Sequence, residues 1–416
     1  MKKESIRKIF WIIGGSQLQA PLIKEVHRLG LDVLITDRNP ECMCKNLGEY
    51  FYPVDVFDLQ KNIELLFQLQ SQGARLAGIL AAGIDANVTA AALARLANLP
   101  GVDPKAAFIT HNKAAFRKFL TEHNLPHPQW REVKDERDVK EAITKIGFPL
   151  IIKNVDSSAS RGTKKFFSPA PWAELYNVFR SAQEVSSTHT ALVEELLDGE
   201  EQTVETLFDA QGVFRPCFIT DRFFEDKNVW ATEQGLRHPS ALPPKTQKQL
   251  YALVRRTAQA LGITIGAAKA DTIITKKGPM IIEMTTRLSG GFDCQYLVPA
   301  ATGKNILRAA ILTALGKPFN PSLLRDTKKR IALSASLWPA PGSILTGISG
   351  LKNAKRIPGF ENFFLTHQVG EMIQPYSDSA KRVCYIIVSG PEELSARKTL
   401  GKVSQAIKLQ TQQADV

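Results

Sequence analysis

Short apolar runs alternate with helical patterns over the first hundred residues of the chain. Three of these runs, residues 9–13, 33–36 and 76–82, have the length and composition of buried strands. An amphipathic helix that ends near Gly30 follows the first run, and an Ala-rich helix over residues 87–98 follows the third. Strands that alternate with helices in this way pair in parallel. The chain therefore begins with a predicted α/β lobe.

The pattern changes after this lobe, for which we expect residues 1–111. Asn112 is placed to cap a new helix. Beyond it, strand-like segments follow one another with hairpin-like turns, which favours an α+β arrangement. We expect a central domain over residues 112–318, with two halves at 112–188 and 189–318. A linker rich in Pro and Lys then leads to a small α+β domain, the C-terminal domain of residues 328–416.

Composition narrows the class of protein. With 416 residues, of which 44% are hydrophobic, the chain is large enough for two or three packed lobes. The five scattered Cys residues favour a reducing compartment, so we expect a cytoplasmic protein. No apolar run is long enough for a signal-peptide core or a membrane span. The net charge of +12 suits an anionic partner, but the basic residues are spread along the chain without a recognisable nucleic-acid-binding module.

Residues 269–284 have the pattern of a β-hairpin. A three-residue loop would place Asp271 directly opposite Glu283, and the two-residue period of a strand then puts Thr285 and Arg287 on the same face as Glu283. Opposed carboxylates repel each other unless a cation lies between them, and such oxygen ligands suit Mg²⁺ that bridges phosphates. The alternative is an exposed strand face on which Arg287 pairs with Glu283. A register slip of one residue would separate the two carboxylates.

A second candidate site follows the predicted strand at residues 149–153. This strand ends in Lys153, and a loop of small and hydroxyl-bearing residues follows it. Backbone N–H groups and hydroxyls in such a loop can bind phosphate, while Lys153 and Arg161 supply positive charge. A solvated Ser-rich turn is the alternative interpretation. The candidate residues of this phosphate loop are Ser158, Ser160, Arg161, Gly162 and Thr163.

Three further segments carry weaker signals. A strand runs into the acidic linker at residues 194–201, whose backbone could bind an adenine edge while a glutamate binds the ribose; an acidic surface turn is the alternative. His238 could bind a substrate carboxylate or act as a base, or be an ordinary solvated loop residue. The turn at residues 14–16 lacks the G-x-G-x-x-G spacing, which disfavours a nicotinamide or flavin cofactor.

Taken in order along the chain, these segments resemble the ATP-grasp superfamily. The resemblance covers nearly the whole chain and rests on the order of five motifs that are weak individually. It implies an ATP-grasp fold with a Rossmann-like pre-ATP-grasp lobe. It also implies that Lys153 is both an ATP ligand and a catalytic residue, and that the phosphate loop closes over the triphosphate. The implied ATP-binding residues are Lys113, Lys153, Ser158, Ser160, Arg161, Gly162, Thr163, Glu194, Glu195, Leu196, Leu197 and Glu201.

Within that superfamily, residues 283–291 are most similar to carboxylate–amine ligases of the L-amino-acid ligase kind. Residues 341–350 and 375–383 are similar to the small C-terminal lobe of those enzymes. The resemblance implies that Arg287 is catalytic and stabilises an acyl-phosphate. The implied metal ligands are Asp271, Glu283 and Thr285, and the implied substrate-binding residues are His238, Arg287, Ser289 and Gly290.

Two departures from the family pattern concern the metal site. The family commonly has Glu where Asp271 stands and Asn where Thr285 stands. Asp is shorter than Glu, and a hydroxyl is a poorer metal ligand than an amide carbonyl, so the number or the affinity of metal ions is open. An ATP-binding regulatory relative that has lost turnover is therefore an alternative.

We expect an ATP-dependent ligase that forms an acyl-phosphate from a small carboxylic or amino acid and transfers the acyl group to an amine, releasing ADP and phosphate. Its expected cofactors are ATP and Mg²⁺ or Mn²⁺, and its expected partners are the small-molecule carboxylate and amine. We expect no nucleic-acid or membrane partner, and a homodimer is an open expectation because many relatives are dimers. A second alternative is a carboxyphosphate-using enzyme of the purine-biosynthesis or biotin carboxylase type.

Overall fold

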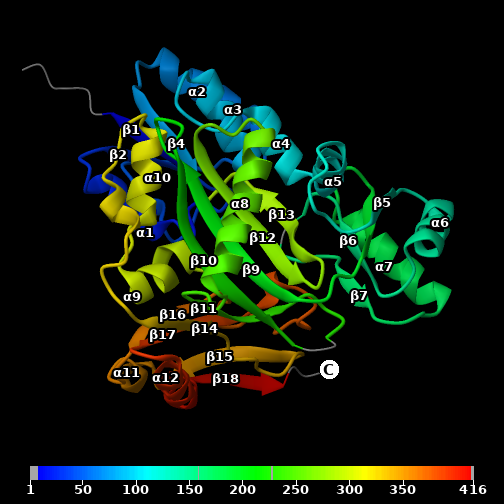
Figure 1. Cartoon of the computed structure of the whole chain (residues 1–416). Helices are drawn as coiled ribbons and strands as arrows, with labels where there is room; N and C mark the ends of the chain where they lie inside the picture. The colour runs from blue at the N-terminus through cyan, green and yellow to red at the C-terminus, as the bar shows by residue number, and fades with distance from the viewer. Residues whose placement is uncertain (1–7, 158, 226–227, 414–416) are drawn as a thin grey trace, which may run out of the picture.

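The first sheet is the parallel sheet that the alternating pattern predicts. In the computed structural model, which describes residues 8–157, 159–225 and 228–413, its strands have the order β3-β2-β1-β4 (Figure 1). These strands are β1 (Ile9–Ile13), β2 (Asp32–Thr36), β3 (Tyr50–Tyr52) and β4 (Leu76–Ala81). Apolar residues of α1 (Ala20–His27) and α10 (Ile306–Ala314) pack in one cluster with this sheet, and those of α2 (Leu59–Ser71) and α3 (Asn87–Leu96) pack in another. The predicted α/β lobe is confirmed.

A small antiparallel sheet forms a second lobe, at the right of Figure 1. Two helices lead into it, α4 (Pro104–His111) and α5 (Lys113–Glu122). Asn112 caps α5 as predicted, since its side chain accepts a hydrogen bond from the backbone N–H of Ala115 at 2.8 Å. The strand order is β5-β8-β6-β7, and α6 and α7 pack on the sheet. The elements are β5 (Trp130–Val133), α6 (Glu136–Ile146), β6 (Leu150–Asn154), β7 (Lys164–Phe166), α7 (Trp172–Glu184) and β8 (Ala191–Glu195).

The central sheet has eight strands in the order β13-β12-β9-β10-β11-β14-β17-β16 within the described residues. The helix α8 (Pro244–Ala260) packs on it through Leu250, Leu253 and Val254. Its strands are β9 (Glu200–Phe208), β10 (Phe214–Phe224), β11 (Glu233–His238), β12 (Gly266–Thr275), β13 (Gly278–Thr285), β14 (Ile331–Ala335), β16 (Phe360–Leu365) and β17 (Cys384–Gly390). Strand pairing between β11 and β14 therefore crosses the predicted boundary before residue 328.

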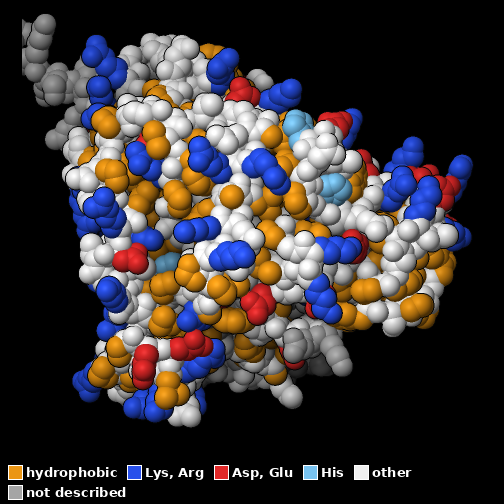
Figure 2. All heavy atoms as spheres, viewed as in Figure 1, with side chains coloured by type: hydrophobic (Ala, Val, Ile, Leu, Met, Phe, Trp, Pro, Cys, Tyr) orange, Lys and Arg blue, Asp and Glu red, His pale blue; other side chains and the backbone are white. Residues whose placement is uncertain are grey.

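The rest of the C-terminal region covers the far end of this sheet. A two-stranded sheet, β15 with β18, lies beside α11 and α12 at the bottom of Figure 1. These elements are β15 (Ser343–Ser349), α11 (Leu351–Ala354), α12 (Glu393–Ala406) and β18 (Lys408–Gln413). The helices among the described residues include none that is both long and apolar enough to cross a bilayer. Figure 2 shows Lys and Arg side chains scattered over the visible face, as their spread along the sequence predicts.

The hairpin of β12 and β13 forms with a different turn from the predicted one. Thr275 pairs with Gly278 around a two-residue loop, so the predicted three-residue loop is wrong. Asp271 nevertheless pairs with Glu283, because a β-bulge leaves Ile282 as an extra residue on β13. The bulge therefore restores the predicted opposition of the two carboxylate-bearing residues.

Candidate functional site

A cavity of about 420 Å³ is lined by residues of the small lobe, the central sheet and the C-terminal region. Its volume is typical of a site for a small molecule. The structure brings together in its wall most of the residues predicted from the sequence: Lys113, Lys153, Ser160, Thr163, Glu194, Glu195, Leu196, Leu197, Glu201, Asp271, Glu283, Arg287, Ser289 and Gly290.

Four other predicted residues, all of them described by the structure, are not part of this wall. Arg161 and Gly162 lie in the phosphate loop, but Gly162 packs closely against α7, since a Cβ atom there would lie 3.0 Å from the helix backbone. Thr285 is buried at the end of β13 and does not line the cavity. His238 also lies outside the wall. Ser158 falls outside the described residues.

His238 is buried at the end of β11, with 2% of its surface exposed. Its Nδ1 atom lies 3.1 Å from the Ile219 carbonyl oxygen and 3.3 Å from the Thr220 hydroxyl. Burial lowers the pKa of His238 to about 3, so the ring is neutral near physiological pH. In this position the imidazole supports the pairing of β10 with β11 and makes no direct contact with the cavity.

The phosphate loop between β6 and β7 has an unusual backbone. Ala159 and Ser160 have φ angles of 58° and 61°, in the left-handed region that non-Gly residues seldom adopt. Lys113 holds the start of the loop, because its Nζ atom donates hydrogen bonds to the Ser157 carbonyl at 2.6 Å and to Asn154 Oδ1 at 3.3 Å. Strained backbone held by its surroundings is typical of functional loops.

A buried ion triad lies beside this loop. Glu194 binds the Arg117 guanidinium at 2.7 Å and the Lys153 ammonium at 2.6 Å. Burial alone would raise the pKa of Glu194, but the charges of Arg117 and Lys153 lower it. Arg117 also donates a hydrogen bond of 2.6 Å to the carbonyl of Ile282, the bulge residue. One side chain of α5 thus connects the small lobe to the strand that carries Glu283.

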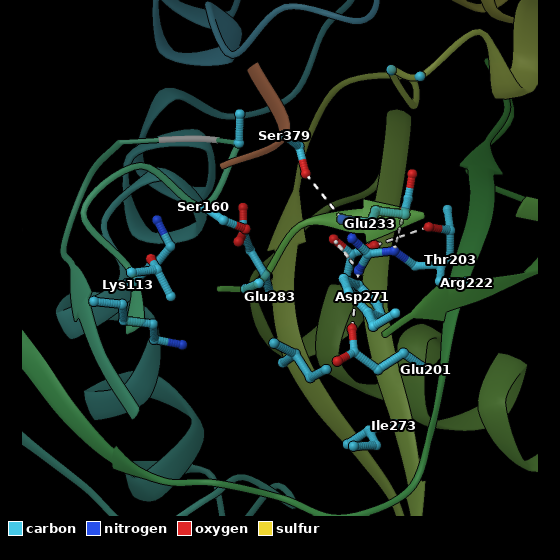
Figure 3. A pocket seen from close by; sticks show the side chains of 18 of the residues that line it. Lys113, Ser160, Glu201, Thr203, Arg222, Glu233, Asp271, Ile273, Glu283 and Ser379 are labelled. Atoms are coloured by element: carbon cyan, nitrogen blue, oxygen red, sulfur yellow. Dashed lines mark hydrogen bonds and ion pairs between the residues drawn. The ribbon is translucent and has the colours of Figure 1, made fainter. Parts of the chain in front are cut away.

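Arg222, on β10, is the centre of a second charged cluster, which the sequence pattern did not reveal (Figure 3). Its guanidinium lies 2.8 Å from Glu233, 3.3 Å from Glu201 and 3.3 Å from Asp271. The Lys269 ammonium lies 2.6 Å from Asp271 on its other side. Burial would raise the pKa of Asp271, but Arg222 and Lys269 hold it well below its usual range. Asp271 is therefore ionised and fully engaged by cations.

The side chain of Glu283 differs from that of Asp271 in having no hydrogen bond or ion pair within the part of the chain that the structure describes. In Figure 3 it lies between the Arg222 cluster and the side that carries Lys113 and Ser160. No group of three or more His, Cys, Asp or Glu side chains among the described residues is close enough to hold a metal ion. The Glu283 carboxylate suits a hard cation that is shared with phosphate oxygens, whereas Asp271 would be a second ligand only after Lys269 or Arg222 released it.

Arg287 is held by a residue of the first lobe. Its Nε atom donates a 2.8 Å hydrogen bond to Asp85 Oδ1, and Nη2 contacts the same oxygen. Ala82 pairs with Leu288 in a parallel bridge, so the end of β4 joins the segment after β13. Gly83 and Asp85, in the turn that follows β4, thus line the site, and Asp85 fixes the orientation of the buried Arg287 guanidinium.

The C-terminal region supplies the remaining wall. Ser379, Ala380, Arg382 and Tyr385 line the cavity. The backbone N–H of Ser379 donates a 3.0 Å hydrogen bond to the carbonyl of Ala159 in the phosphate loop. Arg382, only 1% exposed, pairs with Glu233 at 3.3 Å. The site therefore combines all three regions of the chain.

Comparisons with known proteins match two segments of the chain to families. Residues 146–295 match the model of the ATP-grasp domain, and residues 337–412 match that of the L-amino acid ligase C-terminal domain 2. Together these two segments cover just over half of the chain. The first segment carries most of the cavity wall, and the second includes Ser379 and Arg382.

Whole-chain relatives have low sequence identity. The chain is 27% identical over 342 residues to an uncharacterized protein of Sinorhizobium fredii, covering 80% of this chain and 68% of that protein. It is 24% identical to carnosine synthase 1 of Gallus gallus over 74% of this chain but only 35% of that longer protein. The crystal structure of L-amino acid ligase from Bacillus licheniformis superposes with a TM-score of 0.81 at 21% identity, over 99% of this chain and 100% of that one. This likeness confirms the fold.

Proposed function

The chain belongs to the ATP-grasp superfamily, and from that premise we propose that it is an ATP-dependent carboxylate–amine ligase. In the proposed reaction, ATP phosphorylates a small carboxylic or amino acid, and an amine then attacks the acyl-phosphate with release of ADP and phosphate. The observation that carries this proposal is the wall that holds both Arg287, fixed by Asp85, and Glu283, whose side chain has no ion pair among the described residues. The match of residues 337–412 to an L-amino acid ligase domain favours an amine over other acceptors.

The small lobe would hold the nucleotide. Lys113 and Lys153 line the cavity near the phosphate loop and would offset the charge of the phosphates. Ser160 and Thr163 would donate hydrogen bonds from the loop. The segment 194–197 would hold the adenine, mainly through its backbone and the two leucines, because the Glu194 carboxylate is already engaged by Arg117 and Lys153. Glu201 would bind the ribose.

The opposite wall would carry the reacting groups. Mg²⁺ or Mn²⁺ held by Glu283 and Asp271 would neutralise phosphate charge during in-line transfer. Arg287 would stabilise the negative charge of the acyl-phosphate and of the tetrahedral intermediate that follows it. Asp85 serves this role by holding the guanidinium in one orientation before substrate binds, so that little reorganisation is needed during the reaction.

Phosphate release tests the proposal. The purified protein is given ATP, Mg²⁺ and pooled small carboxylates and amines, and we expect phosphate release that depends on both substrates. Glu283→Gln and Arg287→Ala should each lower the rate about 100-fold or more, the scale seen when charge stabilisation is removed. The matched controls are Glu200→Gln, on β9 but exposed, and Arg256→Ala, exposed on α8. Variants at 283 and 287 that keep the rate of these controls would refute the site assignment.

The pairing of Asp271 with Arg222 and Lys269 favours one alternative, an ATP-binding regulatory protein without turnover. Calorimetric titration with ATP decides between the two functions. Tight ATP binding without ADP formation across the pooled substrates would support the regulatory function and overturn the ligase. ADP formation that requires bicarbonate would instead identify a carboxyphosphate-using enzyme.

A further inference from the structure

Asp293 is a cavity residue to which the proposed function gives no role. It begins the π-helix η2 (Asp293–Leu297), shortly after Ser289 and Gly290, which share its wall. Phe292, just before it, has a left-handed backbone with a φ angle of 62°, and this turn brings Asp293 to the cavity. The side chain is only 2% exposed. Asp293 is therefore a buried carboxyl group in the cavity wall that also carries Ser289 and Gly290.

The surroundings of Asp293 leave it without a cation. Its Oδ1 atom accepts a 3.1 Å hydrogen bond from the Thr220 hydroxyl, and no ion pair reaches it from the described residues. The charged groups that face it are Glu205 on β9, Glu233 on β11 and the more favourable Lys269 on β12. Burial raises the pKa of Asp293 well above its usual range, although the Thr220 hydrogen bond lowers it.

Several other acidic groups of the same cavity are satisfied by cations, and Glu283 would be satisfied by the proposed metal ion. Asp85 binds Arg287, Glu194 binds Arg117 and Lys153, and Asp271 binds Arg222 and Lys269. A buried carboxylate without a positive partner is costly, and such groups are candidates for a functional role. A cationic group of a ligand would supply the missing partner. In the proposed reaction the amine substrate is protonated near neutral pH, and it is the reactant whose ammonium group must come to the acyl carbon.

We propose that Asp293 receives the ammonium group of the amine substrate and accepts its proton as the nitrogen attacks the acyl-phosphate. This inference rests on the proposed ligase function. An ammonium ion has no lone pair to form the new bond, so it must lose a proton before attack. In a buried site of low polarity, a neutral amine beside a neutral carboxylic acid is favoured over two unscreened charges. Burial thus makes the ionised Asp293 carboxylate a stronger base towards the ammonium group, while the Thr220 hydrogen bond favours this ionised form.

Two protons leave the ammonium nitrogen during this step. The first ammonium proton passes to Asp293, and the freed nitrogen lone pair forms the C–N bond. The bond between the acyl carbon and the phosphate oxygen breaks, and its electrons leave with phosphate. The second proton lost by nitrogen goes to the departing phosphate. Asp293 returns its proton to solvent when the amide product leaves and the cavity opens.

Hydroxylamine, used as an alternative nucleophile, distinguishes deprotonation of the amine by Asp293 from the earlier phosphorylation of the carboxylate. Hydroxylamine is largely unprotonated at neutral pH, so it attacks an acyl-phosphate without needing a base. With Asp293→Asn, we expect hydroxamate formation at about the wild-type rate but amide formation from an ordinary alkylammonium substrate slower by about 100-fold or more, the contribution of a general base. The kcat for the amide should also rise much more steeply with pH in the variant, because the ammonium must lose its proton to solvent.

The pattern of loss across the two products tests the role of Asp293. Equal loss of hydroxamate and amide formation, or no loss of either, would overturn the role of Asp293. A wild-type protein that forms neither product from any carboxylate would refute the proposed ligase instead. Thermal unfolding checks that Asp293→Asn is folded, and Thr220→Val is the second variant. Removal of the Thr220 hydroxyl should slow amide formation and leave hydroxamate formation unchanged, and the reverse pattern would also overturn the inference.

Discussion

At the scale of single residues, Arg222 has to satisfy three carboxylates at once. Arg222→Met removes the shared cation, so Glu201, Glu233 and Asp271 repel one another. We expect the unfolding free energy to fall by about 3 kcal/mol, the lower end for removing one partner of a buried ion pair, because the side chain is 18% exposed. Urea denaturation of the variant, with Arg256→Met as the surface control, measures this loss.

The same variant tests how the cluster relates to metal binding. Without Arg222, the released carboxylates can bind a divalent cation, so Mg²⁺ should raise the Tm of Arg222→Met more than the Tm of the wild type. An equal Mg²⁺ effect on both proteins would show that Arg222 does not compete with a cation for Asp271.

The stability of the folded protein should depend on pH through Glu205. It is fully buried on β9, accepts a 2.8 Å hydrogen bond from the Ser289 N–H, and has its pKa raised from 4.5 to about 7, chiefly by burial. A raised carboxyl pKa means that the folded state favours the protonated form. Its contribution to stability is therefore present below the ordinary pKa and is lost as the pH rises through about 7.

Glu205→Gln removes this titration while keeping an oxygen for Ser289. Between about pH 5 and pH 8, wild type should lose about 3 kcal/mol of unfolding free energy relative to the Gln variant, from the linkage of pKa to stability. Urea denaturation across this pH range measures the difference, and the exposed Glu200→Gln is the control on the same strand. A constant difference between wild type and Glu205→Gln would contradict the assigned pKa.

At the scale of elements, the hairpin shows what a sequence pattern can and cannot predict. The opposition of Asp271 and Glu283 was predicted correctly, but from a three-residue loop that does not form. A two-residue loop and a bulge at Ile282 give the same pairing. Local spacing cannot distinguish these two solutions, because the carbonyl of the bulge residue Ile282 binds Arg117, which lies far away in the sequence.

The sequence signal for Arg117 is its position on α5. It is a charged residue among the buried positions of an amphipathic helix, between Phe116 and Phe119. Such a residue requires a buried partner, but the sequence does not name Glu194 as that partner. The catalytic candidates that follow strands were predictable, whereas Arg117, Arg222 and Arg382 were not, because their partners come from segments far away in the chain.

Arg117→Met tests this link between elements. It leaves Glu194 with one cation and the Ile282 carbonyl without its donor, both in a buried setting. We expect a loss of about 3–5 kcal/mol in unfolding free energy, the range for breaking a buried pair. Denaturant titration gives the value, and Lys118→Met, at an exposed position of the same helix, should change it little. A loss no larger than that of the control would contradict the structural role of the triad.

At the scale of the whole molecule, the three predicted regions share one site. The order of motifs along the sequence predicted the ATP-grasp fold, since each motif lies at a strand end or a loop of recognisable composition. The sequence did not predict that β14 and β17 extend the central sheet, because pairing between distant strands leaves no local signal. Nor did it predict that residues 379–385 enter the cavity wall.

The hydrogen bond from the Ser379 N–H to the Ala159 carbonyl links the C-terminal region directly to the phosphate loop. ATP bound under that loop should therefore order both segments. In hydrogen–deuterium exchange with MgATP, we expect peptides covering residues 159–165 and 376–382 to gain protection together.

Arg382→Met should separate the two responses. Arg382 anchors the segment 376–382 to β11 through Glu233, so its loss frees that segment and removes the support it gives to Ala159. With MgATP, protection of the phosphate-loop peptide should then fall towards that of the nucleotide-free protein, while Lys402→Met, exposed on α12, should behave as wild type. If the phosphate-loop peptide is protected equally in Arg382→Met and Lys402→Met, the C-terminal region forms part of the wall without contributing to closure of the loop.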